Sequence, residues 1–106
     1  LICMQKNLKR GRPEGSTTFD PLVAHCFGKA VVEVRTAKGM SQLNLALDAS
    51  IERAHMGRIE RGERVPNLVA IIKIADALGC SASELIGRFE IHKTAASQAE
   101  MLRQSV

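Results

Sequence analysis

The chain has 106 residues and carries 15 Lys and Arg against 11 Asp and Glu, a net charge of +4 at neutral pH. This length fits one domain, and 45% hydrophobic residues suffice for a modest core, so a wholly disordered chain is disfavoured. With three Phe and no Trp or Tyr, a nucleic-acid binder that stacks bases on aromatic rings is also disfavoured. The basic charge permits DNA, RNA or an acidic membrane surface as a partner without selecting among them.

The cysteines and the apolar runs define the expected compartment. Cys3, Cys26 and Cys80 are far apart and odd in number, which argues against a zinc finger or a disulfide framework and indicates a reducing environment. No segment reaches the roughly 18 apolar residues of a membrane span, and the first residues do not resemble a secretory signal. We therefore expect a cytoplasmic protein with no membrane partner.

Residues 1–19 differ in composition from the rest of the chain. They combine four basic residues with several Gly, Pro, Ser and Thr and lack apolar periodicity, so they are predicted to form a flexible basic arm. Asp20 and Pro21 then form a helix start, because Asp is a good N-cap and Pro is favoured at the first helical position. Apolar residues recur at spacings of three and four across the predicted helix 22–38, which Gly39 ends.

Two short helices are predicted next, over residues 42–49 and 52–61, joined by a very short turn. Ser41 caps the first and Gly62 ends the second. A fourth helix, 68–78, begins at the cap Asn67, and its inward face is predicted to consist of Leu68, Ile71, Ile72, Ala75 and Leu78.

The last part of the chain opens with a capping box. Ser81 and Glu84 have the required spacing, so a fifth helix should run through Leu85 and Ile86. A weaker periodicity over residues 92–104 allows a sixth, C-terminal helix. No segment alternates like a strand, and the fold class is therefore predicted as all-α. The expected organisation is an arm (1–19), a helical domain (20–88) and an extension (89–106).

Two short helices joined by a tight turn are the layout of a helix-turn-helix unit. The chain resembles the phage repressor and Cro-type helix-turn-helix domain, the XRE-like family, in its residue pattern over 27–46, 51–66 and 67–79. The pattern includes the run Ile59-Glu60-Arg61-Gly62. The resemblance covers about residues 24–87. It implies a five-helix lambda-repressor-like fold that binds double-stranded DNA and is not an enzyme.

The second helix of the unit is the expected recognition helix. Its N-terminal half should present base-reading side chains to the major groove, and these are Glu52, Arg53, Ala54, His55 and Arg58. Arg53 is the first candidate, because Arg is the commonest bidentate reader of guanine. A solvated charged face is the alternative interpretation.

Phosphate contacts are expected around this helix, from Ser41, Gln42, Arg61, Arg64 and Asn67. For Arg61 and Arg64, simple solubility is the alternative. The resemblance implies a different role for Arg35 and Glu60, which are expected to form a largely buried salt bridge between the first and third helices.

The chain departs from the family pattern at four positions. Glu52 stands where the family often places Ser or Thr as the cap of the recognition helix. Ser50 stands in the inter-helix turn where the family usually has Gly, and it is strained if that position needs a positive φ. Leu43 and Leu47 replace charged residues and are expected on one exposed face.

The arm contains a second, shorter motif. Arg10, Gly11 and Arg12, within the run from Lys9 to Pro13, resemble an AT-hook core, which places Arg in a narrow A·T minor groove. Nonspecific attraction to phosphates is the alternative of similar weight.

The sequence thus predicts a homodimeric repressor of a mobile-element operon, of phage, plasmid or restriction–modification type, on a palindromic operator. Dimer contacts are expected from Leu85, Ile86, Phe89, Ile91 and Leu102. One alternative is an antitoxin that binds its toxin or another protein co-regulator. The other is an interaction module without DNA binding. No cofactor, metal site or catalytic constellation is expected.

Overall fold

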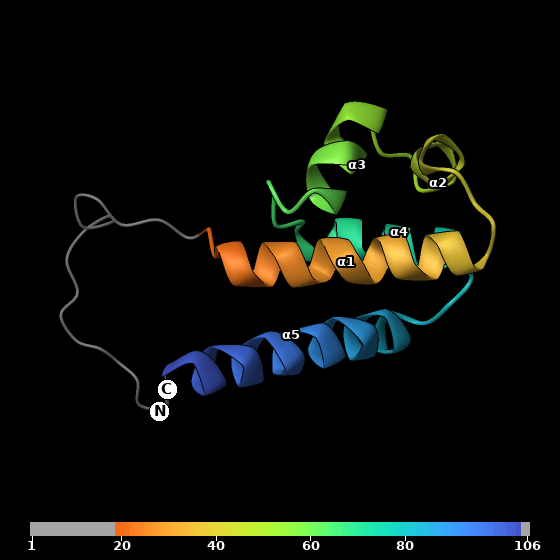
Figure 1. Ribbon diagram of the computed structural model, residues 1–106. Helices are drawn as coiled ribbons and strands as arrows, with labels where there is room; N and C mark the ends of the chain where they lie inside the picture. The colour runs from red at the N-terminus through yellow and green to blue at the C-terminus, as the bar shows by residue number, and fades with distance from the viewer. Residues whose placement is uncertain (1–18, 105–106) are drawn as a thin grey trace, which may run out of the picture.

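The computed structural model describes residues 19–104, which form five helices joined by short connections (Figure 1). The helices are α1 (Pro21–Ala37), α2 (Gln42–Asp48), α3 (Arg53–Glu60), α4 (Leu68–Leu78) and α5 (Ala82–Gln104). Residues 19–104 contain no strand, so the predicted all-α class with five helices is confirmed. None of the helices in this range combines the length and the apolar character needed to cross a bilayer.

Side-chain caps begin four of the helices at the predicted residues. The Asp20 carboxylate accepts from two amides of the first turn of α1, at 3.0 and 3.2 Å. Ser41 and Asn67 cap α2 and α4 through bonds of 3.0 and 2.8 Å to amides three residues on. At α5 the predicted capping box is present, with the Ser81 amide donating to Glu84 at 2.8 Å and the Glu84 amide donating to Ser81 at 3.0 Å. The hydrogen bond from the Ser81 amide, together with the Ser81 side chain, holds the pKa of the Glu84 carboxylate below its ordinary value.

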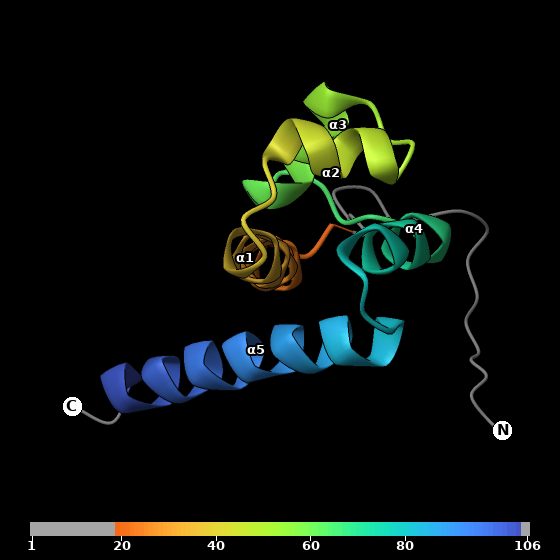
Figure 2. The ribbon, with the colours of Figure 1, turned by 90° about the vertical axis from the view of Figure 1, so that its right-hand side faces the viewer.

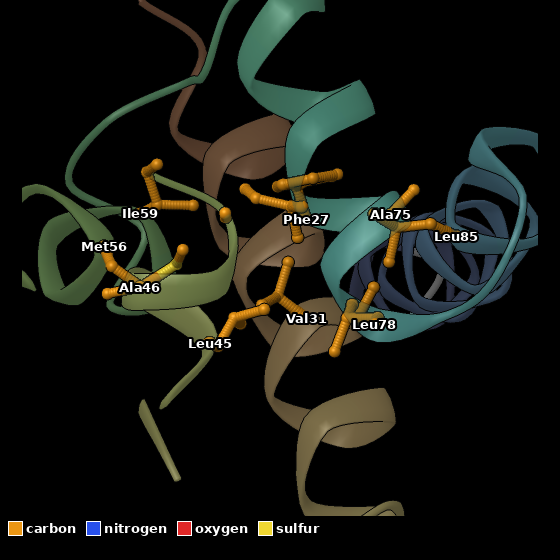
Figure 3. Packing of buried hydrophobic residues seen from close by; sticks show 12 residues of the cluster. Phe27, Val31, Leu45, Ala46, Met56, Ile59, Ala75, Leu78 and Leu85 are labelled. Atoms are coloured by element: carbon orange, nitrogen blue, oxygen red, sulfur yellow. The ribbon is translucent and has the colours of Figure 1, made fainter. Parts of the chain in front are cut away.

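Apolar side chains from all five helices meet in one core (Figure 3). Helix α1 runs through its middle, with α2 and α3 on one side and α5 on the other (Figures 1 and 2). The buried residues are Phe27, Ala30, Val31, Leu45, Ala46, Ala49, Met56, Ile59, Ile74, Ala75, Leu78 and Leu85. The core therefore holds the helix-turn-helix pair against α1 and α4.

The predicted inward face of α4 is partly wrong. Leu68 and Ile72 were expected in the core but are exposed, whereas Ile74, which was not expected there, is fully buried. The reason is that α4 carries apolar residues on two faces, so that its periodicity alone does not select the buried one.

Helix α5 is continuous, and residues 92–104 extend it rather than form a separate sixth helix. The domain boundary expected at residue 88 falls inside it. The helix is tied to α1 by Glu33, which accepts hydrogen bonds from Arg88 and lies 2.8 Å from His92 Nε2. These two partners lower the pKa of Glu33.

The predicted dimer residues occupy three different environments on α5. Leu85 is fully buried in the protomer's own core and is not available to a partner, so this part of the prediction is wrong. Ile86 and Phe89 are half-buried against the same core. Ile91 and Leu102 are exposed.

Candidate nucleic-acid interface

The turn between α2 and α3 closes through a Schellman-type pair of backbone hydrogen bonds. The Ile51 amide donates to the Ala46 carbonyl at 2.9 Å, and the Ser50 amide donates to the Leu47 carbonyl at 3.1 Å. Ser50 accordingly has a φ of 56°, the left-handed region that favours glycine. The helix-turn-helix unit thus holds a mildly strained residue at the position where the family usually has Gly.

Replacing Ser50 with Gly should raise the free energy of unfolding by about 0.5–1 kcal/mol. Relief of the left-handed strain outweighs the extra entropy that Gly gives the unfolded chain. Urea denaturation measures the difference. As a control, Ser97→Gly inside α5 should lower stability by about 0.5 kcal/mol, because Ser97 is exposed in a regular helix. A loss of stability in Ser50→Gly would contradict the strain.

Two glycines bring α3 into close contact with α1. A Cβ at Gly28 would lie 2.5 Å from the Glu60 carbonyl oxygen and 2.6 Å from that of Ile59. Gly62, which follows α3 with a φ of 78°, lies against the His25 backbone, with 3.0 Å from its Cβ position to His25 Cα. The orientation of α3 is therefore set by backbone packing on α1.

Arg35 and Glu60 reinforce the same contact. Arg35 Nε and Nη2 donate to the two Glu60 carboxylate oxygens at 2.8 and 3.1 Å, and Arg35 Nη1 donates to the Met40 carbonyl at 3.0 Å. The Arg35 side chain is 15% exposed and the Glu60 side chain is 4% exposed. This bidentate pair joins α1 to α3 and to the segment that leads into α2.

Gln42 makes a contact that the sequence analysis did not predict. Its Nε2 donates to Glu60 Oε1 at 2.8 Å, so the side chain expected on a phosphate joins the Arg35–Glu60 network. The sequence analysis missed this contact, because residues 18 positions apart on two helices carry no local signal. The amide group keeps a second N–H for a ligand.

The outer side of α3 carries the predicted base-reading residues. Glu52, Arg53 and Ala54 are exposed at its N-terminus, whereas His55 and Arg58 are half-buried. Glu52 is the N-cap and makes no side-chain cap bond. Arg58 Nε is enclosed and has no hydrogen-bond partner among the described residues. Arg53 is thus the basic side chain that lies most openly at the start of α3.

The predicted phosphate residues Arg61, Arg64 and Asn67 are exposed on the loop that follows α3. Asn67 Oδ1 caps α4, and Arg61 pairs with Glu63 at 3.0 Å. This pairing lowers the pKa of Glu63 and raises that of Arg61. The sequence analysis did not identify Glu63 as a partner, although its spacing of two residues from Arg61 was a signal.

Other candidate sites add little to this surface. Arg10, Gly11 and Arg12, the predicted minor-groove residues, lie outside the described residues. Within residues 19–104, no cluster of His, Cys, Asp and Glu has the arrangement of a metal site. Burial raises the pKa of the Cys80 thiol, which favours the neutral, unreactive form.

A family model described as helix-turn-helix matches residues 31–85, more than half of the chain. This chain belongs to the helix-turn-helix family. The match covers α2, α3 and α4 entirely, together with the last seven residues of α1, which include Arg35, and the first four residues of α5. The rest of α5 lies beyond it.

Relatives of this helix-turn-helix chain include control proteins. Control protein C.BamHI of Bacillus amyloliquefaciens is 39% identical over 61 residues, covering 57% of this chain and 75% of that protein. The uncharacterized HTH-type transcriptional regulator YazB of Bacillus subtilis (strain 168) is 37% identical over 62 residues, covering 58% and 90%. The crystal structure of the restriction-modification controller protein C.AhdI from Aeromonas hydrophila has a TM-score of 0.56 at 45% identity, covering 60% of this chain and 94% of that one.

Proposed function

We propose that this helix-turn-helix protein is a sequence-specific double-stranded DNA-binding transcriptional regulator. It acts as a homodimeric repressor of a mobile-element operon, of the restriction–modification type. The main support for the proposal is that α3 has a buried apolar side and an exposed basic side. Met56 and Ile59 are buried in the core, whereas Arg53 is exposed at the end of the helix that enters a major groove. The similarity to C.BamHI and C.AhdI supports the type of operon.

Arg53 is the proposed principal base reader. An exposed guanidinium at the start of a recognition helix reaches the O6 and N7 atoms of guanine in a bidentate contact. Ala54 beside it fits a thymine methyl group, and Glu52 accepts from a cytosine amino group. His55 and Arg58, which are half-buried, are proposed to contact the bases or phosphates nearest the helix.

Phosphates are proposed to bind beside α3. The proposed donors are Ser41 and the second N–H of Gln42, which precede the helix in the chain, and Arg61, Arg64 and the Asn67 amide, which follow it. Arg61 leaves Glu63 on binding, because a phosphate oxygen replaces the carboxylate as acceptor. These contacts position the domain without reading sequence. The arm residues Arg10, Gly11 and Arg12 are proposed to add a minor-groove contact.

Replacing Arg53 with Ala should weaken binding to the operator by about 1–3 kcal/mol and relax the preference at one base position. Gel shifts on the DNA upstream of the protein's own gene measure this change, with random DNA as the reference. Lys93→Ala, which removes an exposed positive charge from α5, is the matched control and should bind as the wild type does. Equal binding of wild type and Arg53→Ala to both DNAs would reject sequence-specific repression.

A second candidate function is an antitoxin that also represses its own operon. Leu43 and Leu47 favour it, because both are exposed on α2, four residues apart, and form an apolar surface for a protein partner. Recovery of the protein in a stable complex with a toxin encoded in the same operon would support this function.

A further inference from the structure

The Glu63 carboxylate holds one of the proposed phosphate donors. Arg61 Nε donates to Glu63 Oε2 at 3.0 Å, and Arg61 Nη2 donates to Glu63 Oε1 at 3.3 Å, so both carboxylate oxygens engage the guanidinium. Arg binds a phosphate group through the same bidentate arrangement. Glu63 thus occupies the donors of Arg61 that a DNA phosphate would use.

We propose that Glu63 competes with the DNA backbone for Arg61 and thereby limits the affinity of this protein for DNA. The inference rests on the proposed function, because it concerns a residue beside the proposed phosphate contact. Every complex in which Arg61 binds a phosphate must first break the Arg61–Glu63 pair. Glu63 is therefore an affinity-determining residue, although it is not itself a ligand of DNA.

The backbone at the end of α3 fixes Glu63 beside Arg61. The Glu63 amide donates to the Arg58 carbonyl at 2.8 Å. The Gly62 amide donates to the Ile59 carbonyl at 3.1 Å, and Gly62 has a φ of 78°. These two bonds and the left-handed glycine form a Schellman motif, which holds Glu63 two residues past the C-cap Arg61. An ordered turn thus brings the carboxylate to the guanidinium.

The end of α3 is an unfavourable place for an acidic residue. The C-terminus of a helix carries partial negative charge, so it favours Lys, Arg or His. The pKa of Glu63 is nevertheless lowered, mainly by the hydrogen bond from Arg61 and further by the charges of Arg61 and Arg58. A residue that opposes a local preference for stability is a candidate for a functional role.

Arg61 lies across α3, beside a second proposed phosphate donor. A Cβ at Gly57 would lie 3.0 Å from Arg61 Nη1 and 3.6 Å from Gln42 Oε1, so the two side chains meet over this glycine. Gln42 in turn donates to Glu60 at 2.8 Å. Of the two carboxylates that hold these donors, the Glu60 side chain is 4% exposed and the Glu63 side chain is 52% exposed. Glu63 is therefore the one that a phosphate can displace.

The Arg61–Glu63 pair acts on DNA binding rather than on the fold. Both side chains are more than half exposed, so water and salt screen their attraction and the pair adds little stability. A phosphate that replaces the carboxylate leaves Glu63 unpaired near the negative backbone of the duplex. That carboxylate retains a cation, which offsets part of the counterion release that drives binding. Removal of the carboxylate should therefore strengthen binding.

Fluorescence anisotropy of the full chain with a labelled random-sequence duplex, from about 50 to 200 mM salt, tests the proposal. Glu63→Gln should bind about 10-fold more tightly than the wild type, the effect of one charge-assisted contact. Its log K should also fall more steeply with log salt, by about one unit. Glu90→Gln removes the same charge from an exposed position on α5, across α1 from α3 (Figure 1), and should bind almost as the wild type does.

A double-mutant cycle with Arg61→Ala separates competition for Arg61 from a simple loss of negative charge. In the Arg61→Ala background, Glu63→Gln should tighten binding less than about two-fold, because there is no guanidinium to release. The cycle also has a readout without DNA. In a carboxyl NMR titration of the free protein, Arg61→Ala should return the pKa of Glu63 toward its ordinary value.

Three results would overturn the assignment. These are equal affinity of the wild type and Glu63→Gln, an equal gain in Glu90→Gln, or the full gain in the Arg61→Ala background. The substituted side chains are exposed, and circular dichroism checks that each variant is folded. Because the duplex holds no operator, failure here is distinguishable from failure of sequence-specific regulation, which the Arg53 gel shifts decide independently. An absence of binding to every duplex would reject both.

Discussion

Replacing Arg35 with Ala is expected to lower the free energy of unfolding by about 3–5 kcal/mol. The change would leave the Glu60 carboxylate, whose side chain is 4% exposed, without the cation that compensates its charge. It would also remove the donor to the Met40 carbonyl and loosen the contact between α1 and α3. Thermal and urea denaturation of the two proteins at neutral pH measure the loss.

Arg61→Ala is the matched control for this prediction. It makes the same substitution in an ion pair of similar length, but Arg61 and Glu63 are both more than half exposed. Water and salt screen such a pair, so stability should change little. An unchanged melting temperature in Arg35→Ala would show that the Arg35–Glu60 pair does not support the fold.

Gly28→Ala is expected to destabilise the domain by about 3 kcal/mol, the upper part of the range for overpacking. The added methyl group would lie 2.5 and 2.6 Å from two backbone carbonyl oxygens of α3, at Glu60 and Ile59. Backbone atoms in a packed helix cannot move aside as a flexible side chain does, so α3 would have to shift away from α1. Urea denaturation gives the size of the effect.

Gly87→Ala is the opposite case within the same chain. Gly87 lies inside α5, and nothing lies within 4 Å of the position where its Cβ would be. Ala should therefore stabilise the protein by about 0.5–1 kcal/mol through its better helix propensity. If both glycine variants gained stability alike, the close approach at Gly28 would be refuted.

The starts of the helices could be predicted because the signals are local. Asp20, Ser41, Asn67 and the box of Ser81 and Glu84 each need only neighbouring amides, and all of them cap the expected helices. The family resemblance added the Arg35–Glu60 pair, which spacing alone could not predict.

The wrong predictions for α4 and α5, and the contact of Gln42 that was not predicted, concern features that depend on tertiary structure. In α4, two apolar faces compete for the core, so Leu68 was assigned inward although Ile74 is buried there. In α5, the weak periodicity over residues 92–104 allows a separate sixth helix, whereas the structure has one continuous helix to Gln104. The engagement of Gln42 with Glu60 depends on how α2 and α3 pack, which no local pattern specifies.

The backbone contact of α3 with α1 has a consequence for redesign. Gly28, Gly62 and the Arg35–Glu60 pair fix the angle of α3 from its inner side. Among the described residues, Arg53 and Ala54 make no side-chain hydrogen bond and bury no apolar surface in the core. Exchange of these outer residues should therefore change the operator that the domain recognises while leaving its free energy of unfolding almost unchanged.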